Sequence, residues 1–142
     1  MARIAPIHTG PIEKGGKQKQ AAHRIVCEKH LAFIRKLPCL ASGVTNVVIA
    51  HHLKLDLNRM GRRSGDDTAV PLNNILHQGY PESLHSGSES VFWNELGIDP
   101  RPIAKFFWEN TGNIRLCTIE IKAMRAAAQV RKAHGVRLLT ER

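Results

Sequence analysis

The sequence predicts an α+β fold in which a short two-stranded hairpin is flanked by helices. Two runs of apolar, β-prone residues, at positions 47–50 and 70–72, are separated by a polar loop that contains several arginines. Apolar residues recur at helical spacing before the first run and after the second, over residues 21–37 and from residue 86 onward. A chain of 142 residues is long enough to build one domain with a modest core around such a hairpin.

The composition is strongly basic, with 21 lysine and arginine residues against 12 acidic residues and a formal net charge of +9. This excess favours a polyanionic partner, most simply nucleic acid, although charge alone does not separate that partner from a merely basic soluble protein. The three cysteines are odd in number and form no Cys-x-x-Cys pair, which favours a reducing compartment. No apolar run reaches membrane-spanning length and no signal peptide is visible, so we expect a cytoplasmic protein without a membrane partner.

The N-terminal part combines a polar arm with a helix. Residues 1–20 are rich in glycine, proline and lysine, which is typical of a flexible basic arm that either adds phosphate contacts or is a tail without a role. Residues 21–37 carry apolar side chains at near-helical spacing, and Pro38 ends the predicted helix. The opposite face of this helix either faces solvent or lies along DNA, and its cations are Arg24, Lys29, Arg35 and Lys36.

Three further helices are predicted after the hairpin. The first covers residues 86–96, with Phe92 and Trp93 in the core and Gly97 at its end. A turn at residues 99–100 leads into a short helix over residues 102–110, and the last helix covers residues 118–134 and has a basic outer face. We therefore expect a hairpin core with flanking helices over residues 21–112, and a basic C-terminal helix within residues 113–142 packed on or beside it.

Four histidines surround the predicted hairpin. His51 and His52 end the first strand, where the alternation of side chains directs them to opposite sides. His77 follows the second strand, where a helix can begin, and His85 lies further along the chain. Imidazoles bind divalent ions well and act as bases near neutral pH. Phosphodiester hydrolysis needs a base, a nucleophilic water and a cation that stabilises developing charge, so the pattern indicates metal-dependent hydrolysis of nucleic acid.

Six stretches of the sequence follow one another in a recognisable order: HLAFIRKLPC at 30–39, AHHL at 50–53, MGRRSGDDTAVPL at 60–72, LHSGSE at 84–89, FW at 92–93 and GIDP at 97–100. Together they resemble the HNH (ββα-metal) endonucleases, in particular the phage and bacterial recombination-enhancement (Ref-like) nucleases. The resemblance covers residues 30 to about 111, a little over half of the chain. It implies a ββα-metal core, DNA as the substrate and one divalent ion, for which Mg²⁺, Mn²⁺, Ni²⁺ and Zn²⁺ are candidates.

The resemblance also implies a role for each histidine. His51 and His77 would be ligands of the catalytic metal, and His85 would be a further ligand. His52 would be the general base that deprotonates the attacking water. The residue that orients this base falls at Asp67 or at the threonine after it, and we favour Asp67 because a carboxylate can accept the imidazole N–H. The cations of the polar loop either contact phosphate or face solvent, and they are Lys54, Arg59, Arg62 and Arg63.

The chain departs from the family pattern in two places. Ref-like domains usually hold a structural zinc with four ligands; Cys39 is retained here, whereas the other three positions carry Ser42, Asn73 and Leu76. One thiolate cannot hold a structural zinc, so we expect none, and we expect packing of the leucine and the flanking helices to replace it. The second departure is that His77 and His85 are eight residues apart, with a glycine and a proline between them, so His85 either returns to the site or leaves it.

These features leave more than one function open. The leading prediction is a metal-dependent endonuclease or nickase that acts on DNA with little sequence specificity. The alternative is a catalytically degenerate member of the family that binds DNA, or a recombination partner such as a recombinase, without cutting. A small phage structural protein that binds metal adventitiously is a third possibility, and an RNA substrate also remains open because no feature of the sequence distinguishes the ribose.

Overall fold

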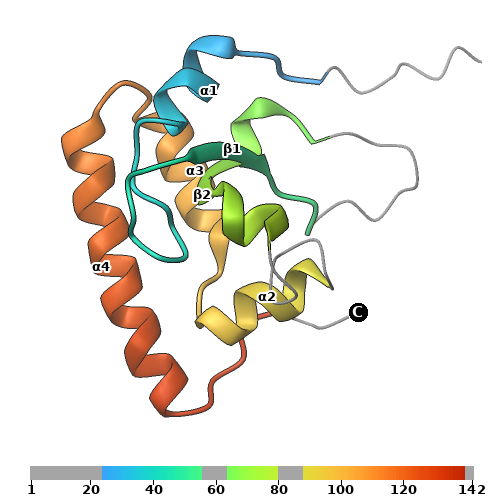
Figure 1. The fold of residues 1–142 in the computed structure, drawn as a ribbon, viewed down its shortest axis with the longest axis vertical. Coiled ribbons are helices and arrows are strands. Elements are labelled where there is room, and N and C mark those ends of the chain that lie inside the picture. Colours follow the sequence, from blue (N-terminus) through green and yellow to red (C-terminus); the bar gives the residue numbers. More distant parts are fainter. Residues whose placement is uncertain (1–23, 56–63, 80–87, 140–142) are drawn as a thin grey trace, which may run out of the picture.

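A two-stranded hairpin lies at the centre of the fold (Figure 1). The structure is a computed structural model, and it describes residues 24–55, 64–79 and 88–139. Strand β1 (Val48–His52) pairs antiparallel with β2 (Ala69–Asn73), and this register places His52 opposite Ala69. The hairpin and its surrounding helices confirm the predicted α+β fold.

Strand β1 begins one residue later than the apolar run that predicted it. Val47 has a φ of +52°, in the left-handed region that a β-branched residue rarely adopts, so it cannot continue the extended strand. Its carbonyl accepts a hydrogen bond of 2.9 Å from the backbone N–H of Asn74, just beyond the end of β2. The chain therefore reaches the hairpin through a bend at Val47, and this bend is fixed by pairing with the opposite strand.

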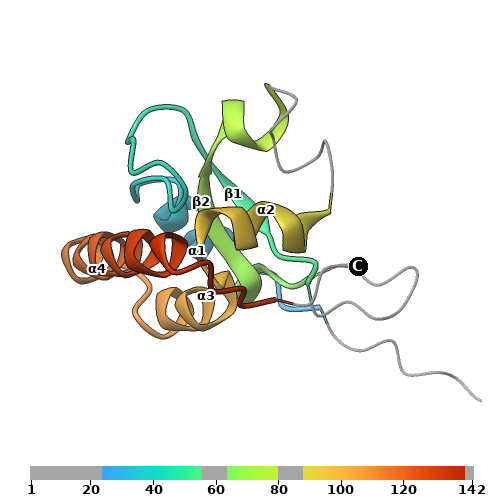
Figure 2. The same ribbon diagram turned by 90° about the horizontal axis from the view of Figure 1, so that it is seen from below.

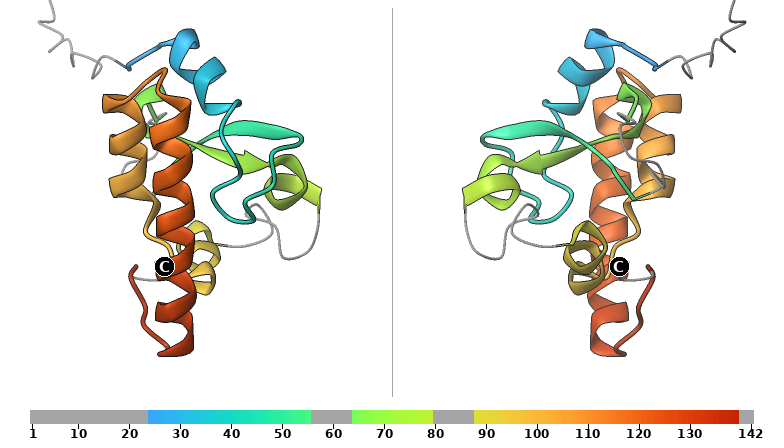
Figure 3. Two further views of the ribbon diagram at one scale, coloured as in Figure 1. Left: turned by 90° about the vertical axis from the view of Figure 1, so that its left-hand side faces the viewer. Right: turned by 90° about the vertical axis from the view of Figure 1, so that its right-hand side faces the viewer.

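The helices form layers around the hairpin. Helices α3 (Pro100–Glu109) and α4 (Ile114–Ala133) lie side by side on one side of it, and α1 (Glu28–Ile34) lies over one end (Figures 2 and 3). A π-helical turn, η2 (Ile75–Gly79), follows β2 on the side away from α3 and α4. Helix α2 (Glu89–Leu96) packs against α4, and a 3₁₀ turn, η1 (Asp66–Thr68), enters β2 and packs against α1 and α3.

The helix starts differ from the predicted ones for local reasons. Residues 24–27 are not helical, because the backbone N–H of Cys27 donates to the Asp66 side chain and the Ile25 carbonyl accepts from the Asp66 N–H. Helix α3 begins two residues early, since the Asp99 side chain caps it and proline suits its first position. Helix α4 begins four residues early because the Asn113 side chain accepts the N–H of Leu116 at 3.1 Å.

The core joins β2 to the helices that follow it. Trp93 of α2 and Phe107 of α3 are completely buried, which confirms the prediction that the aromatic side chain of Trp93 belongs to the core. Gly97 ends α2 with a φ of +69°, and a Cβ there would lie 2.8 Å from the Ala128 carbonyl oxygen of α4. Glycine is therefore required by both the backbone and the packing of α2 on α4. The buried residues of α4 that complete the core are Cys117, Ile121 and Ala128.

None of the helices in the described ranges combines the length and the apolar character that crossing a bilayer requires.

Candidate functional site

The end of β1 directs two neighbouring histidines to opposite sides of the strand. The His51 side chain is buried, with 3% of its surface exposed, whereas 29% of the His52 side chain is exposed. The difference follows from the pleat of a strand, in which successive side chains point to opposite faces. The geometry is therefore compatible with the predicted roles, in which His51 binds a metal and His52 acts as a base.

His51 contacts Glu89, a residue that we had not predicted to belong to the site. Its Nε2 lies 2.8 Å from Oε1 of Glu89 in the first turn of α2, and because a carboxylate only accepts, Nε2–H is the donor. The other oxygen of Glu89 accepts the backbone N–H of Lys54 at 2.8 Å, and Trp93 Nε1 donates to Oε1 at 3.4 Å. The sequence feature that could have identified Glu89 is its place as an acidic residue in the first turn of the helix that follows the hairpin.

Burial and hydrogen bonding shift the pKa of Glu89 in opposite directions. Burial alone would raise the pKa of this carboxyl group. The hydrogen bond from His51, the charge of that imidazole and the donors at Lys54 and Trp93 outweigh burial and lower the pKa below its ordinary value of 4.5. Glu89 is therefore ionised at neutral pH, and it places a negative charge beside His51.

His77 joins His51 on the same side of the hairpin. The two ring centroids are 5.1 Å apart, and the rings are inclined at 62°. His77 comes from η2, which begins two residues after β2, so the π-helical turn carries it back over the strand end. The structure thus brings together two of the three predicted metal ligands, while His85 lies outside the described residues.

The donor chemistry of this group suits a divalent ion, because two imidazoles and a carboxylate are common ligands of Zn²⁺ and related metals. His51 Nε2 and Glu89 Oε1 are 2.8 Å apart, a hydrogen-bond distance that is shorter than the roughly 3.3–3.6 Å between two ligands of a tetrahedral ion. Among the described residues, no three histidine, cysteine or acidic side chains are arranged to hold an ion together. The described part of the site thus offers the bonded pair of His51 and Glu89 beside a second imidazole, that of His77.

On the other side of the strand, His52 contacts Asp66, and the prediction that Asp67 holds this ring is wrong. His52 Nε2 lies 2.8 Å from Asp66 Oδ1. The reason is the 3₁₀ turn η1, which enters β2 and directs successive side chains differently, so that the buried Asp66 faces His52. Asp67 instead lines a cavity between η1 and α3.

Asp66 is a buried carboxylate that is held from three sides. It accepts a 2.7 Å hydrogen bond from the Cys27 backbone N–H, and Arg24 lies 3.7 Å away. Burial alone would raise its pKa, but the hydrogen bonds from Cys27 and His52 and the nearby cationic groups lower the pKa below 3.8. Because an ionised Asp66 only accepts, the neutral His52 ring carries its proton on Nε2 and keeps a lone pair on Nδ1.

Acid is expected to destabilise the fold through Asp66 and Glu89. Both folded pKa values lie below the ordinary values, so their contribution to stability is complete above about pH 4.5 and is lost as the pH falls through the folded values. We expect the unfolding free energy of Asp66→Asn to fall less steeply than that of the wild type below this pH. Urea titrations at several pH values measure this, and parallel curves for the two proteins would contradict the assignment.

Three of the four positions at which the resemblance would place ligands of a structural zinc, residues 39, 42 and 73, lie close together. Cys39 is fully buried, and its Sγ accepts backbone N–H groups of Ser42 at 3.4 Å and Asn73 at 3.2 Å. The Asn73 side chain bonds the Asn46 carbonyl and the N–H of residue 75, both at 2.9 Å. Leu76 is partly buried and packs on the core. Hydrogen bonds and packing therefore tie together the segments that a zinc ion would join, and the side chains present do not suit such an ion.

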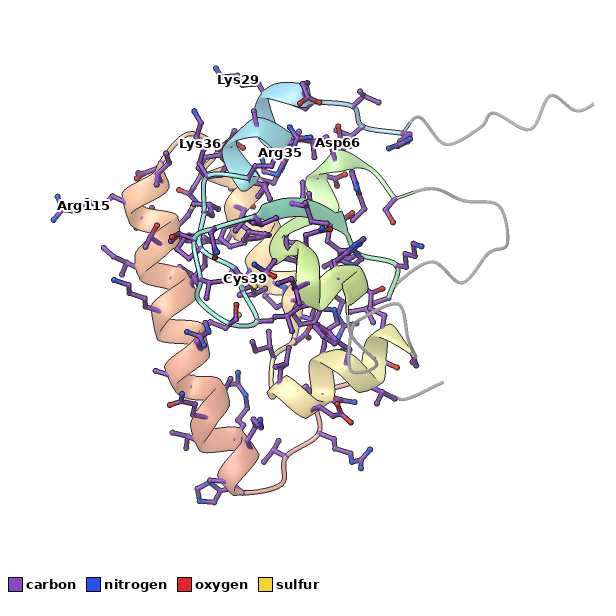
Figure 4. All side chains as sticks on the ribbon, in the orientation of Figure 1. Lys29, Arg35, Lys36, Cys39, Asp66 and Arg115 are labelled. Carbon is purple, nitrogen blue, oxygen red and sulfur yellow. The ribbon has the colours of Figure 1, made fainter. Side chains whose placement is uncertain are left out.

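The predicted basic contacts are only partly described. Lys54 is exposed and follows the strand end, whereas Arg59, Arg62 and Arg63 lie outside the described residues, as does the arm at 1–20. Figure 4 labels a separate group of cations around the α1 end of the molecule, which come from α1, from the two residues directly after it and from the first turn of α4. All of them are exposed, and they are Lys29, Arg35, Lys36 and Arg115. This basic surface matches the net positive charge of the sequence.

Comparison of the chain with models of protein families, with curated proteins and with solved structures found no match.

Proposed function

We propose that this protein is a metal-dependent endonuclease or nickase of the HNH type, which hydrolyses DNA phosphodiester bonds with low sequence specificity. The observation that supports it best is the pair of adjacent imidazoles at the end of β1, each with its own carboxylate. His52 is bonded to Asp66 on one side, and His51 is bonded to Glu89 on the other. A base and a candidate metal ligand are thus held next to each other at a strand end.

In this proposal His52 is the general base. Its Nδ1 lone pair takes a proton from water, the water oxygen forms a bond to phosphorus, and the bond from phosphorus to the leaving oxygen breaks. Asp66 holds the ring orientation and stabilises the imidazolium that forms, because its carboxylate stays ionised. The leaving oxygen takes a proton from bulk water, and His52 later returns its own proton to solvent. Exposure of the His52 ring allows water and substrate to reach it.

The residues that would hold a divalent ion are His51, His77 and Glu89, with His85 as a further candidate. A bound ion would stabilise the negative charge that develops on the phosphate oxygens. The exposed cations of α1, of the turn after it and of α4 would contact the DNA backbone without reading its sequence, which agrees with low specificity.

A second function is favoured by one specific observation. Glu89 already accepts the Nε2–H of His51, so the contact that stabilises His51 in the fold would have to be rearranged for Nε2 to bind a metal. A protein in which this ion pair replaces the metal would bind DNA, or a recombination partner, without cutting it.

One experiment separates the two functions. Supercoiled plasmid is incubated with the protein and Mg²⁺, Mn²⁺ or Ni²⁺, beside a chelator control and a His51→Ala variant whose fold is checked by circular dichroism. Isothermal titration of each metal into both proteins supplies a readout besides activity. Nicking and metal binding that both need His51 support the nuclease, whereas a gel shift with intact plasmid and no metal binding supports the non-cutting protein.

A further inference from the structure

A cavity of about 290 Å³ opens next to the His52–Asp66 pair, between the end of β1, η1 and α3. Two of its lining residues, Leu53 and Asp67, directly follow His52 and Asp66 in the chain. The side chains of His52 and Asp66 themselves do not line it. Its volume is near the lower end of the roughly 300–1,000 Å³ of small-molecule sites, which suits one ring system rather than a base pair.

The walls of the cavity combine an aromatic ring with an acceptor. Trp108 lines it and is held edge-on against the fully buried ring of His30, with centroids 4.9 Å apart. Buried Leu53 and Ala104 add apolar surface. Asp67 also lines the cavity, and its carboxylate accepts no hydrogen bond from the residues that the structure describes. A partly buried carboxylate of this kind is complementary to a ligand that brings its own N–H donors.

One side of the cavity is cationic. Arg101 lines it, and its guanidinium is oriented by Asp99 through two bonds of 2.9 Å, from Nε and from Nη2. Lys105 lies one helical turn further along α3 and also lines the cavity, and its ammonium group is 3.9 Å from the exposed carboxylate of Glu109. A ligand that fits this arrangement carries an anionic group near α3 and donors near η1.

We propose that this cavity binds one unpaired guanine nucleotide of the substrate strand, an inference that rests on the proposed function for the presence of that strand beside His52. The base lies against Trp108, its N1–H and N2–H₂ groups donate to the two oxygens of Asp67, and a phosphate lies near Arg101 and Lys105. Unpaired bases are commonly bound by stacking on aromatic side chains and by hydrogen bonds to the Watson–Crick edge.

Guanine is distinguished from the other bases by the donors on its Watson–Crick edge. It presents two adjacent N–H donors that a single carboxylate can accept together, whereas adenine and cytosine present one amino group and thymine one ring N–H. A site built around a buried acceptor rejects ligands that leave the acceptor unpaired. The protein would thus prefer to cut strands that carry a guanine near the scissile bond.

The test is binding of dGMP, dAMP, dCMP and dTMP to the full chain in a chelator, followed by ¹H–¹⁵N NMR of the two tryptophan indoles. We expect dGMP to shift the Trp108 signal, to leave that of the fully buried Trp93 in place, and to bind about tenfold more tightly than the other three. Deoxyguanosine without phosphate should bind more weakly than dGMP. No shift at Trp108, or equal affinity for the four nucleotides, would overturn the proposal.

Two carboxylate-to-amide variants provide the matched comparison. Asp67→Asn should lose the preference for dGMP by about tenfold, because the amide replaces one acceptor with a donor. Glu95→Gln changes an exposed carboxylate of α2 that does not line the cavity, and it should bind like the wild type. Binding of dGMP by a protein that nicks no plasmid would overturn the nuclease alone, and nicking without dGMP binding would overturn the guanine site alone.

Discussion

Replacing His52 by alanine is expected to lower the rate of plasmid nicking by about 10²–10⁴-fold, the contribution typical of a general base. The ring is bonded through Nε2–H to a buried, ionised Asp66, so its neutral form presents a lone pair at Nδ1 and the carboxylate holds its orientation. Alanine removes both properties and leaves the remaining donors of the hairpin in place. The measurement is the initial rate at which supercoiled plasmid is converted to the nicked circle.

The matched control for this prediction is His134→Ala. His134 is exposed and follows the last turn of α4, where its Nδ1 donates to the Val130 carbonyl at 2.8 Å. This variant also loses one imidazole, so the comparison separates the His52 position from histidine content, and we expect it to nick at the wild-type rate. If His52→Ala nicks as fast as His134→Ala, His52 is not the base.

The largest expected effect on stability comes from Trp93→Ala, which should lower the free energy of unfolding by about 3–5 kcal/mol. Trp93 is completely buried at the junction of α2 with the core, so alanine leaves a large cavity and removes the apolar contacts that its ring makes. The variant also removes the 3.4 Å donor to Glu89, which couples core packing to the carboxylate beside His51. Urea denaturation followed by circular dichroism measures the loss.

Val130→Ala is the control for the stability prediction. Val130 is an apolar residue of α4 with 61% of its surface exposed, so shortening it should change the free energy of unfolding by no more than about 0.5 kcal/mol. If Trp93→Ala lowers the free energy of unfolding as little as Val130→Ala does, the Trp93 side chain is not packed in the core as described. Trp93→Phe, which keeps an aromatic ring, should lie between the two.

Several features of the fold could be predicted from local sequence. The antiparallel hairpin, the opposite directions of His51 and His52, the end of α2 at Gly97 and the buried Trp93 all follow from residue periodicity and from backbone preferences of single residues. The helix starts were less accurate, because side chains such as Asp99 and Asn113 cap helices that apolar spacing alone places a few residues later.

The site partners illustrate what local sequence could not predict. Glu89 is 38 residues from His51 in the chain, and the two meet only because α2 packs back against the end of the hairpin. Asp66 and Asp67 are chemically identical neighbours, and periodicity gives no reason to choose between them. The 3₁₀ turn decides the choice by burying the first beside His52 and turning the second toward α3.

By itself the sequence determined the basic charge, the hairpin with its paired histidines and most of the helices, because these depend on composition and on contacts between residues near in the chain. Only the tertiary structure decided which carboxylate serves each histidine and that a cavity opens between β1, η1 and α3. The physical reason is that such contacts depend on how helices pack across tens of residues, and that packing is set by the whole core rather than by any one segment.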